Sequence, residues 1–263
     1  MKLLEKTGLR AEYATEPHKR QLQKPNEDRL FCDEEKGIFI VLDGVTRVHA
    51  EYEFSPYESA AAEVGEIFIK AVKEYIYAHL DCESEKAILI EAVRVGNRKI
   101  KEYREKKTAD EWIFYPSTLG IISLYRDGRL HYVAVGDCLG VLLRGRSKIL
   151  FGRELSLAAV DLLAVSKAER YALYCNHPET KLSYTVFNGD DQVMDTIDYS
   201  YIDLHEDDTL ILATDGISEY LRYEKAEVLR EQTPRQMIHN SAEFDKPPFA
   251  KYADDKTLIK ISL

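Results

Sequence analysis

The chain has 263 residues, of which 45% are hydrophobic and 31% are charged, and it carries a formal net charge of -10. This composition is typical of a globular protein with a large core, and the negative charge argues against nucleic acid as a partner, whose binders present a basic face. The N-terminal segment is too polar for a signal peptide, and no apolar run approaches a membrane span. The four cysteines form no C-x-x-C pair, which disfavours a zinc or redox motif. We therefore expect one cytoplasmic domain over residues 1–263.

The hydrophobic pattern predicts groups of strands separated by helices. The expected strands are 8–15, 29–33, 37–43, a series of hairpins over 117–151, then 197–204, 209–213 and 257–263. The expected helices are one that begins at Tyr57, one over 85–106, and short ones over 216–231 and 234–241. The two longer helices repeat apolar residues at i, i+3 and i+4, and each is long enough to cover a sheet. This alternation predicts layers of the α+β class.

Carboxylates stand where several of these apolar runs end. Asp43-Gly44 and Asp215-Gly216 each follow a buried strand, and Asp254-Asp255 precede the last one. An Asp-Gly pair alone is typical of a plain turn, which is how we interpret Asp127-Gly128. Several carboxylates gathered at one end of a core would repel one another unless a cation lay between them, and oxygen ligands favour a hard divalent metal. The pattern therefore indicates metal-assisted hydrolysis of a phosphate ester.

In this order, the motifs resemble the protein phosphatase 2C (PPM) family of metal-dependent protein serine/threonine phosphatases. That family has an E-D pair, a strand ending in D-G, a V-G-D-S hairpin, a strand ending in A-T-D-G and a terminal D-N-x-T. The matching segments here are Glu27-Asp28, Asp43-Gly44, Val135-Gly136-Asp137-Cys138, Ala213-Thr214-Asp215-Gly216 and Asp254-Asp255-Lys256-Thr257. Each segment alone is weak evidence for the family. The ordered set is strong evidence, and it covers nearly the whole chain. The resemblance implies two antiparallel β-sheets packed as a sandwich, with helices on both sides.

The resemblance also implies a centre of two Mg²⁺ or Mn²⁺ ions. Asp43 would bridge both ions and Gly44 would offer its carbonyl oxygen, while Asp215 and Asp254 would be further ligands. The pair Glu27-Asp28 would ligate metal directly or through water. Asp137 matches a residue that binds a third, weaker metal in bacterial members of the family, although a plain β-turn acid stays an open alternative.

Two features depart from the family pattern. His49 is the candidate general acid, because the leaving alkoxide needs a proton and histidine is the usual donor near neutral pH. It stands one residue later than in the family's D-G-M-G-G-H and lacks the glycines, so an ordinary surface histidine is the alternative. The family's phosphate-binding arginine falls on Gln23. Lys24 and Arg47, or Arg20, are the candidates to contact phosphate instead.

Together these residues predict a phosphatase that cleaves phosphoserine and phosphothreonine monoesters with a water activated by a binuclear metal centre. The expected partners are a phosphoprotein substrate and, by analogy with the family, a serine/threonine kinase. We expect neither a nucleic acid nor a membrane, and the sequence is silent on oligomeric state. One alternative is a catalytically weak or inactive module that binds phosphoproteins, which Gln23 favours and the retained carboxylates oppose. A two-metal nuclease also fits the carboxylates but conflicts with the charge of -10.

Overall fold

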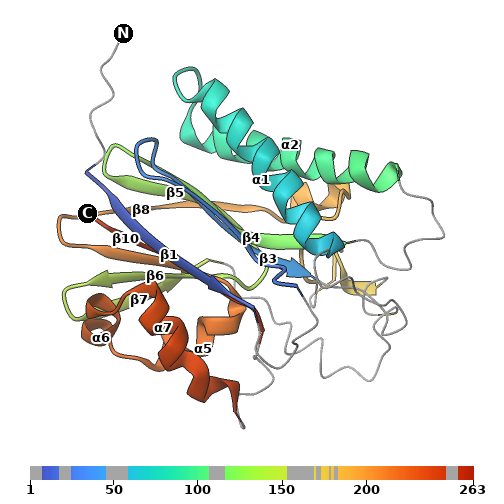
Figure 1. Cartoon of the computed structure of the whole chain (residues 1–263). Helices are drawn as coiled ribbons and strands as arrows, with labels where there is room; N and C mark the ends of the chain where they lie inside the picture. Colours follow the sequence, from blue (N-terminus) through green and yellow to red (C-terminus); the bar gives the residue numbers. More distant parts are fainter. Residues whose placement is uncertain are drawn as a thin grey trace.

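A computed structural model describes residues 8–17, 25–45, 59–106, 116–152, 169, 173–177, 179–180, 183–246 and 254–263. In these ranges the chain forms two five-stranded antiparallel sheets (Figure 1). The first has the order β1 (Arg10–Glu16), β10 (Lys256–Ser262), β9 (Thr209–Ala213), β6 (Leu139–Arg144) and β7 (Ser147–Phe151). The second has the order β2 (Arg29–Asp33), β3 (Ile38–Val45), β4 (Ser117–Arg126), β5 (Arg129–Val135) and β8 (Asp198–Asp203).

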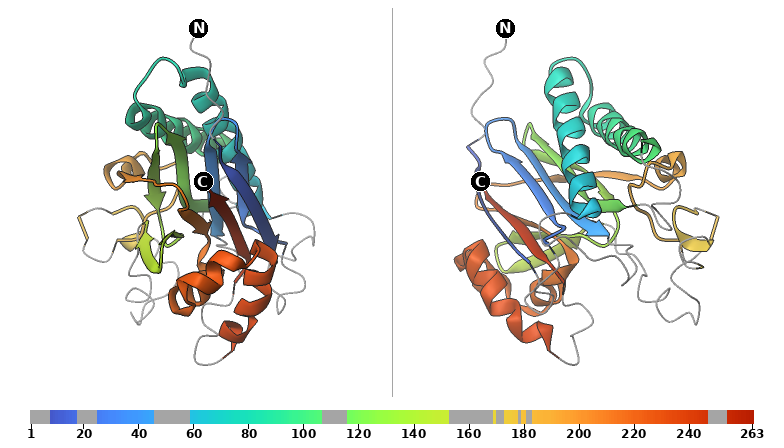
Figure 2. Two further views of the ribbon diagram at one scale, coloured as in Figure 1. Left: turned by 90° about the vertical axis from the view of Figure 1, so that its left-hand side faces the viewer. Right: turned by 45° about the vertical axis from the view of Figure 1, so that its right-hand side comes forward.

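Helices cover the outer face of each sheet, as Figures 1 and 2 show. The long helices α1 (Ala60–His79) and α2 (Glu85–Glu105) pack on each other and on the second sheet. The first sheet is covered by three short helices, which are α5 (Ser218–Tyr223), α6 (Ala226–Glu231) and α7 (Pro234–Asn240). Three 3-10 turns, η2 (Asp191–Asp195), η3 (Asp215–Ile217) and η4 (Ser241–Asp245), complete the described elements. The expected sandwich with helices on both sides is confirmed.

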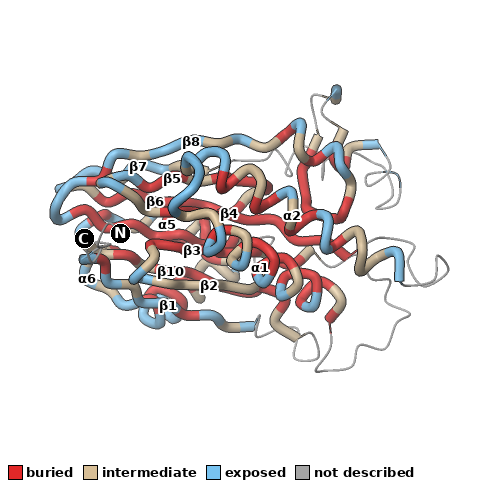
Figure 3. The backbone as a smooth tube through the Cα atoms, turned by 90° about the horizontal axis from the view of Figure 1, so that it is seen from above, coloured by how far each residue is buried: buried red, intermediate tan, exposed pale blue. Residues whose placement is uncertain are grey.

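The central strand β3 shows why the layers form. Its residues Ile38 to Leu42 are all fully buried. Because successive side chains of a strand point to opposite faces, such a run is buried only if both faces are covered. The opposite sheet covers one face and α1 packs on the other, so burial concentrates in the middle of the molecule (Figure 3).

Local signals account for where the helices begin and end. The helix expected from Tyr57 begins at Ala60, because the Ser59 side chain caps it by accepting a hydrogen bond from the amide of Ala62. The helix expected over 216–231 is interrupted instead. Lys148 of β7 donates hydrogen bonds to the carbonyl oxygens at the end of α5, and the backbone is extended at residues 224 and 225 before α6 begins. No helix in the described ranges is long and apolar enough to cross a membrane.

Candidate metal centre

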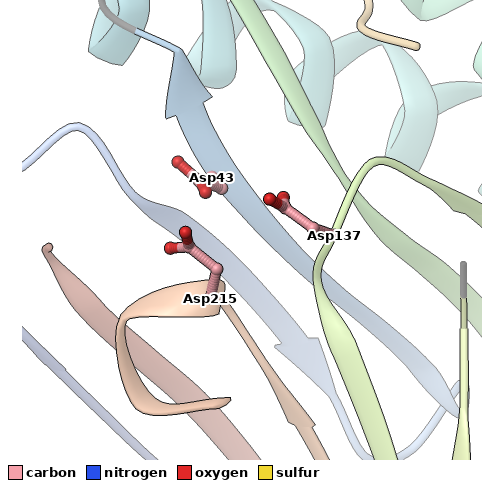
Figure 4. A group of neighbouring side chains, drawn as sticks. All are labelled: Asp43, Asp137 and Asp215. Atoms are coloured by element: carbon pink, nitrogen blue, oxygen red, sulfur yellow. The ribbon is translucent and has the colours of Figure 1, made fainter. Parts of the chain in front are cut away.

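Three aspartates from distant parts of the chain converge at one end of the sandwich. Asp43 lies near the end of β3, Asp137 in the connection from β5 to β6, and Asp215 in η3 directly after β9. Each offers a carboxylate oxygen, and these oxygens lie within 4.8 Å of one another. Figure 4 shows the three side chains directed toward one another. All three are only partly buried, so the group can be reached from solvent.

Strand register explains this convergence. In the first sheet Leu139 of β6 pairs with Ala213 of β9, which puts the residues just before β6 beside those just after β9. In the second sheet Gly120 of β4 pairs with both Leu42 of β3 and Val135 of β5, so Leu42 and Val135 lie at the same level. Asp43 follows Leu42 by one residue, whereas Asp137 and Asp215 follow Val135 and Ala213 by two residues each. The three aspartates therefore lie at the same end of the sandwich.

The glycines of the two Asp-Gly pairs at this site lie where there is no room for a side chain. A Cβ atom on Gly44 would lie 2.5 Å from the carbonyl oxygen of Glu27, and one on Gly216 would lie 2.0 Å from that of Asp255. Neither glycine has a positive φ, whereas Gly128 of the hairpin turn has φ +76 and nothing within 4 Å of its Cβ position. The same dipeptide thus makes a turn at Gly128 and allows close backbone packing at Gly44 and Gly216.

The N-terminal acidic pair is hydrogen-bonded to the C-terminal one and to Thr214, the residue that follows β9. The Glu27 amide donates a hydrogen bond of 2.8 Å to Asp255 Oδ2, and the Ser59 hydroxyl donates to the Glu27 carboxylate. The Thr214 hydroxyl donates a hydrogen bond of 2.8 Å to Asp28 Oδ2. Glu27 and Asp28 are consequently buried, with exposed fractions of 1% and 4%. Three segments that precede or follow strands are held together here by hydrogen bonds.

The aspartates of this group repel one another, and this repulsion adds to the effect of burial on their pKa values. Burial, followed by the charge of Asp255, raises the pKa of Asp28 to about 8. Burial, followed by repulsion from Asp215, raises the pKa of Asp43 well above its ordinary value, and burial with repulsion from Asp137 does the same for Asp215. Asp254 contributes to the upward shift of all three, so its carboxylate belongs to the same electrostatic group.

This donor set suits Mg²⁺ or Mn²⁺. The converging atoms are carboxylate oxygens, which hard divalent cations prefer. The neighbouring Cys138 is buried, and burial followed by the charge of Asp43 raises the pKa of its thiol well above the ordinary value. The thiol therefore stays protonated and is a poor metal ligand. A bound cation would remove the repulsion that raises the pKa values of the aspartates.

The structure places the predicted site residues in three groups. Asp43, Asp137 and Asp215 form the close triad, with Asp28 and Asp254 beside it. Glu27 and Gly44 pack against each other at its margin. His49, Lys24 and Arg47, together with Arg20 and Gln23, lie outside the described residues.

Sequence reasoning missed the residues that hold the carboxylates in place. Thr214 and Thr257 are linked through the Thr214 hydroxyl, which accepts a hydrogen bond of 3.0 Å from the Thr257 amide. Ser59 and Asp255 orient Glu27. A signal for three of the four was present, because Thr214, Asp255 and Thr257 belong to the A-T-D-G and D-D-K-T segments. Nothing in the sequence pointed to Ser59 beyond its suitability as a helix cap.

Comparison with known proteins agrees with this geometry. A model of the protein phosphatase 2C family matches residues 16–244. The fold is similar to that of the serine/threonine phosphatase PstP/Ppp of Mycobacterium tuberculosis, with a TM-score of 0.65 and 20% identity over 97% of this chain and 98% of that one. It is also similar to the serine/threonine phosphatase Stp1 of Staphylococcus aureus, with a TM-score of 0.66 and 15% identity over 100% and 98% of the two chains. A PstP catalytic domain in complex with two manganese ions gives a TM-score of 0.63 at 18% identity, over 97% of each chain. A search of curated protein sequences finds no match.

Proposed function

Because the chain belongs to the protein phosphatase 2C family, we propose that it is an active PPM-type phosphatase that hydrolyses phosphoserine and phosphothreonine monoesters at a centre of two Mg²⁺ or Mn²⁺ ions. The observation that carries this proposal is the convergence of the Asp43, Asp137 and Asp215 carboxylates within 4.8 Å. When bound, the ions would supply Lewis-acid activation of the attacking water and neutralise charge on the phosphoryl oxygens. Crowded carboxylates would cost stability without such a cation.

Each residue of the centre has a proposed role. Asp43 would bridge both ions, because the charges of Asp215, Asp28, Asp137 and Asp254 all act on its carboxylate. Asp215 and Asp254 would complete the ligands on one side, with Asp137 holding a third, weaker ion. Asp28, oriented by Thr214, and Glu27 would ligate metal directly or through water. Gly44 would offer its carbonyl oxygen as a further ligand.

The remaining roles fall on residues outside the described ranges. His49 would protonate the leaving serine or threonine oxygen, since this step needs a proton donor that titrates near neutral pH. Lys24 and Arg47 would contact the phosphoryl oxygens in place of the arginine that Gln23 replaces. The substrate would be a cytoplasmic phosphoprotein that a serine/threonine kinase phosphorylates. The chain would act as one catalytic domain.

The proposal is tested by removing single charges from the triad. Asp43→Asn and Asp215→Asn should each abolish Mn²⁺-dependent hydrolysis of p-nitrophenyl phosphate and of a phosphothreonine peptide, because each removes an anionic metal ligand. Asp127→Asn is the matched control, since Asp127 is also followed by glycine but lies in the β4–β5 hairpin turn. Near-wild-type turnover in either triad variant would show that the bridging arrangement is wrong.

A second candidate is a module that binds phosphoproteins without turnover, which the replacement of the family's arginine by Gln23 favours. It predicts that the wild-type protein binds Mn²⁺ in calorimetry and hydrolyses no phosphopeptide. Turnover that requires Asp43 would exclude it.

A further inference from the structure

Ser117 carries a buried hydroxyl group at the start of β4. It is the first residue of this strand, and its exposed fraction is 0%. Its Oγ makes no hydrogen bond within the part of the chain that the structure describes. Buried hydroxyls are nearly always hydrogen-bonded, to protein or to ordered water, because an unpaired one costs free energy. The Ser117 hydroxyl therefore needs a partner other than these residues.

Strand pairing places the Ser117 side chain on the same face of the sheet as Asp43. Asp43 lies opposite Leu119, and Val45 lies opposite Ser117. Directly paired residues, and residues two apart along a strand, point to the same face. The Asp43 carboxylate approaches Asp215, which follows a strand of the other sheet (Figure 4), so this face points into the sandwich. The Ser117 side chain therefore points the same way as the carboxylate of Asp43.

The strand β4 also lies between the two strands that lead to Asp43 and Asp137. In the second sheet β4 is flanked by β3 and β5, and Asp137 follows the end of β5 by two residues. Leu119 fills part of the space between them, since its side chain leaves no room for a Cβ atom on Gly136. Ser117 is the next residue of β4 on this face and the diagonal neighbour of Asp43. Such neighbours lie about 7–8 Å apart, a gap that an ion and one of its water ligands can bridge.

Two other hydroxyls of β4 already have partners within the protein. Thr118 points to the opposite face, and its hydroxyl donates a hydrogen bond of 2.8 Å to the carbonyl oxygen of Asp43. Ser123 lies on the same face as Ser117 and is also fully buried, and its hydroxyl donates a hydrogen bond of 2.8 Å to the carbonyl oxygen of Phe39. These two hydroxyls connect β4 to the backbone of β3. The Ser117 hydroxyl makes no such bond to the described chain, so it can serve a group that binds from solution.

We propose that Ser117 is a positioning residue of the metal centre, whose hydroxyl hydrogen-bonds a water ligand of an ion held by Asp43. This inference rests on the proposed function. A serine hydroxyl can both donate and accept a hydrogen bond, and Mg²⁺ usually keeps several of its waters. A water is favoured over direct ligation because the carboxylates around Asp43 are the stronger ligands for a hard cation. By orienting that water, the hydroxyl would raise the affinity of the centre for the ion.

The test compares Ser117→Ala with Ser123→Ala, which each remove one buried hydroxyl from the same face of the same strand. Isothermal titration calorimetry measures the Kd for Mn²⁺, and thermal unfolding in EDTA measures the stability of the metal-free protein. Ser117→Ala should raise the Kd about 10-fold or more. It should leave the Tm in EDTA unchanged or higher, because no hydrogen bond of the described metal-free chain is lost. Ser123→Ala should do the opposite, with a lower Tm in EDTA and an unchanged Kd, because it loses the bond to Phe39.

Two results would overturn the inference. One is a Kd for Mn²⁺ that Ser117→Ala leaves unchanged. The other is a Tm in EDTA that falls as far in Ser117→Ala as in Ser123→Ala, which would show that the hydroxyl already stabilises the metal-free protein. The same data separate this inference from the proposed function. Wild-type binding of Mn²⁺ that Ser117→Ala leaves intact rejects the role of Ser117 alone, whereas a wild-type protein that binds no Mn²⁺ rejects the metal centre and the role of Ser117 with it.

Discussion

The backbone amide of Glu27 donates a hydrogen bond of 2.8 Å to the Asp255 carboxylate, which joins residues that lie 228 positions apart. Asp255 is 3% exposed, so this bond is buried. It holds the segment before β2 against the segment before β10, and these segments carry Asp28 and Asp254. The bond is therefore part of the framework that brings the metal-site carboxylates together.

Substitutions at Asp255 should separate this framework role from its charge. Asp255→Ala removes the acceptor of a buried amide and should lower the free energy of unfolding by about 1 to 3 kcal/mol. Asp255→Asn keeps an acceptor oxygen and removes a charge that raises the pKa of Asp28, so it should be clearly more stable than the alanine variant. Urea unfolding in EDTA measures both. Equal destabilisation by the two substitutions would contradict the framework role.

Alanine substitutions at the three Asp-Gly glycines should have unequal effects. A Cβ on Gly216 would lie 2.0 Å from a backbone oxygen, so Gly216→Ala should cost about 3 kcal/mol or more and should weaken Mn²⁺ binding. Gly128→Ala meets no atom and should cost only the strain of a positive φ, about 1 to 2 kcal/mol, with Mn²⁺ binding unchanged. Gly44→Ala should resemble Gly216→Ala. Urea unfolding and Mn²⁺ titration check the contrast, and equal effects at Gly128 and Gly216 would refute it.

Stability of the metal-free protein should fall as pH rises. Asp28 has its pKa raised from 3.8 to about 8, so between these values the folded state keeps a proton that the unfolded state has lost. The unfolded state then binds fewer protons, and the free energy of unfolding decreases with pH through this window. Mn²⁺ should displace the proton, so the increase in Tm that it causes should be greater at pH 8 than at pH 5. Thermal unfolding with EDTA or Mn²⁺ measures this, and an increase independent of pH would argue against burial of Asp28 in a metal site.

Much of the fold could be predicted because burial leaves a local pattern. The strands expected over 29–33 and 209–213 have these bounds in the structure, since each apolar run is bounded by polar or turn-forming residues. The layering came from the family resemblance, because an apolar pattern reports that an element is buried and not which element covers it. The interruption between α5 and α6 was missed because it depends on Lys148, more than 70 positions earlier in the chain.

For the candidate site, individual residues could be predicted from the sequence, but their spatial arrangement could not. Asp43 and Asp215 could be identified because each ends a buried strand in an ordered set of motifs. Their convergence with Asp137 depends on strand register, which single motifs do not encode. The contacts of Ser59 and Asp255 with Glu27 are long-range hydrogen bonds, and such pairs leave no periodic trace in a sequence.

The central claim, that these carboxylates form one metal centre, is tested most directly by isothermal titration calorimetry with Mn²⁺. The account predicts that the wild-type protein binds two ions with high affinity, that Asp43→Asn loses this binding because the bridging carboxylate is gone, and that Asp127→Asn retains it. Wild-type stoichiometry and affinity in Asp43→Asn would contradict the account.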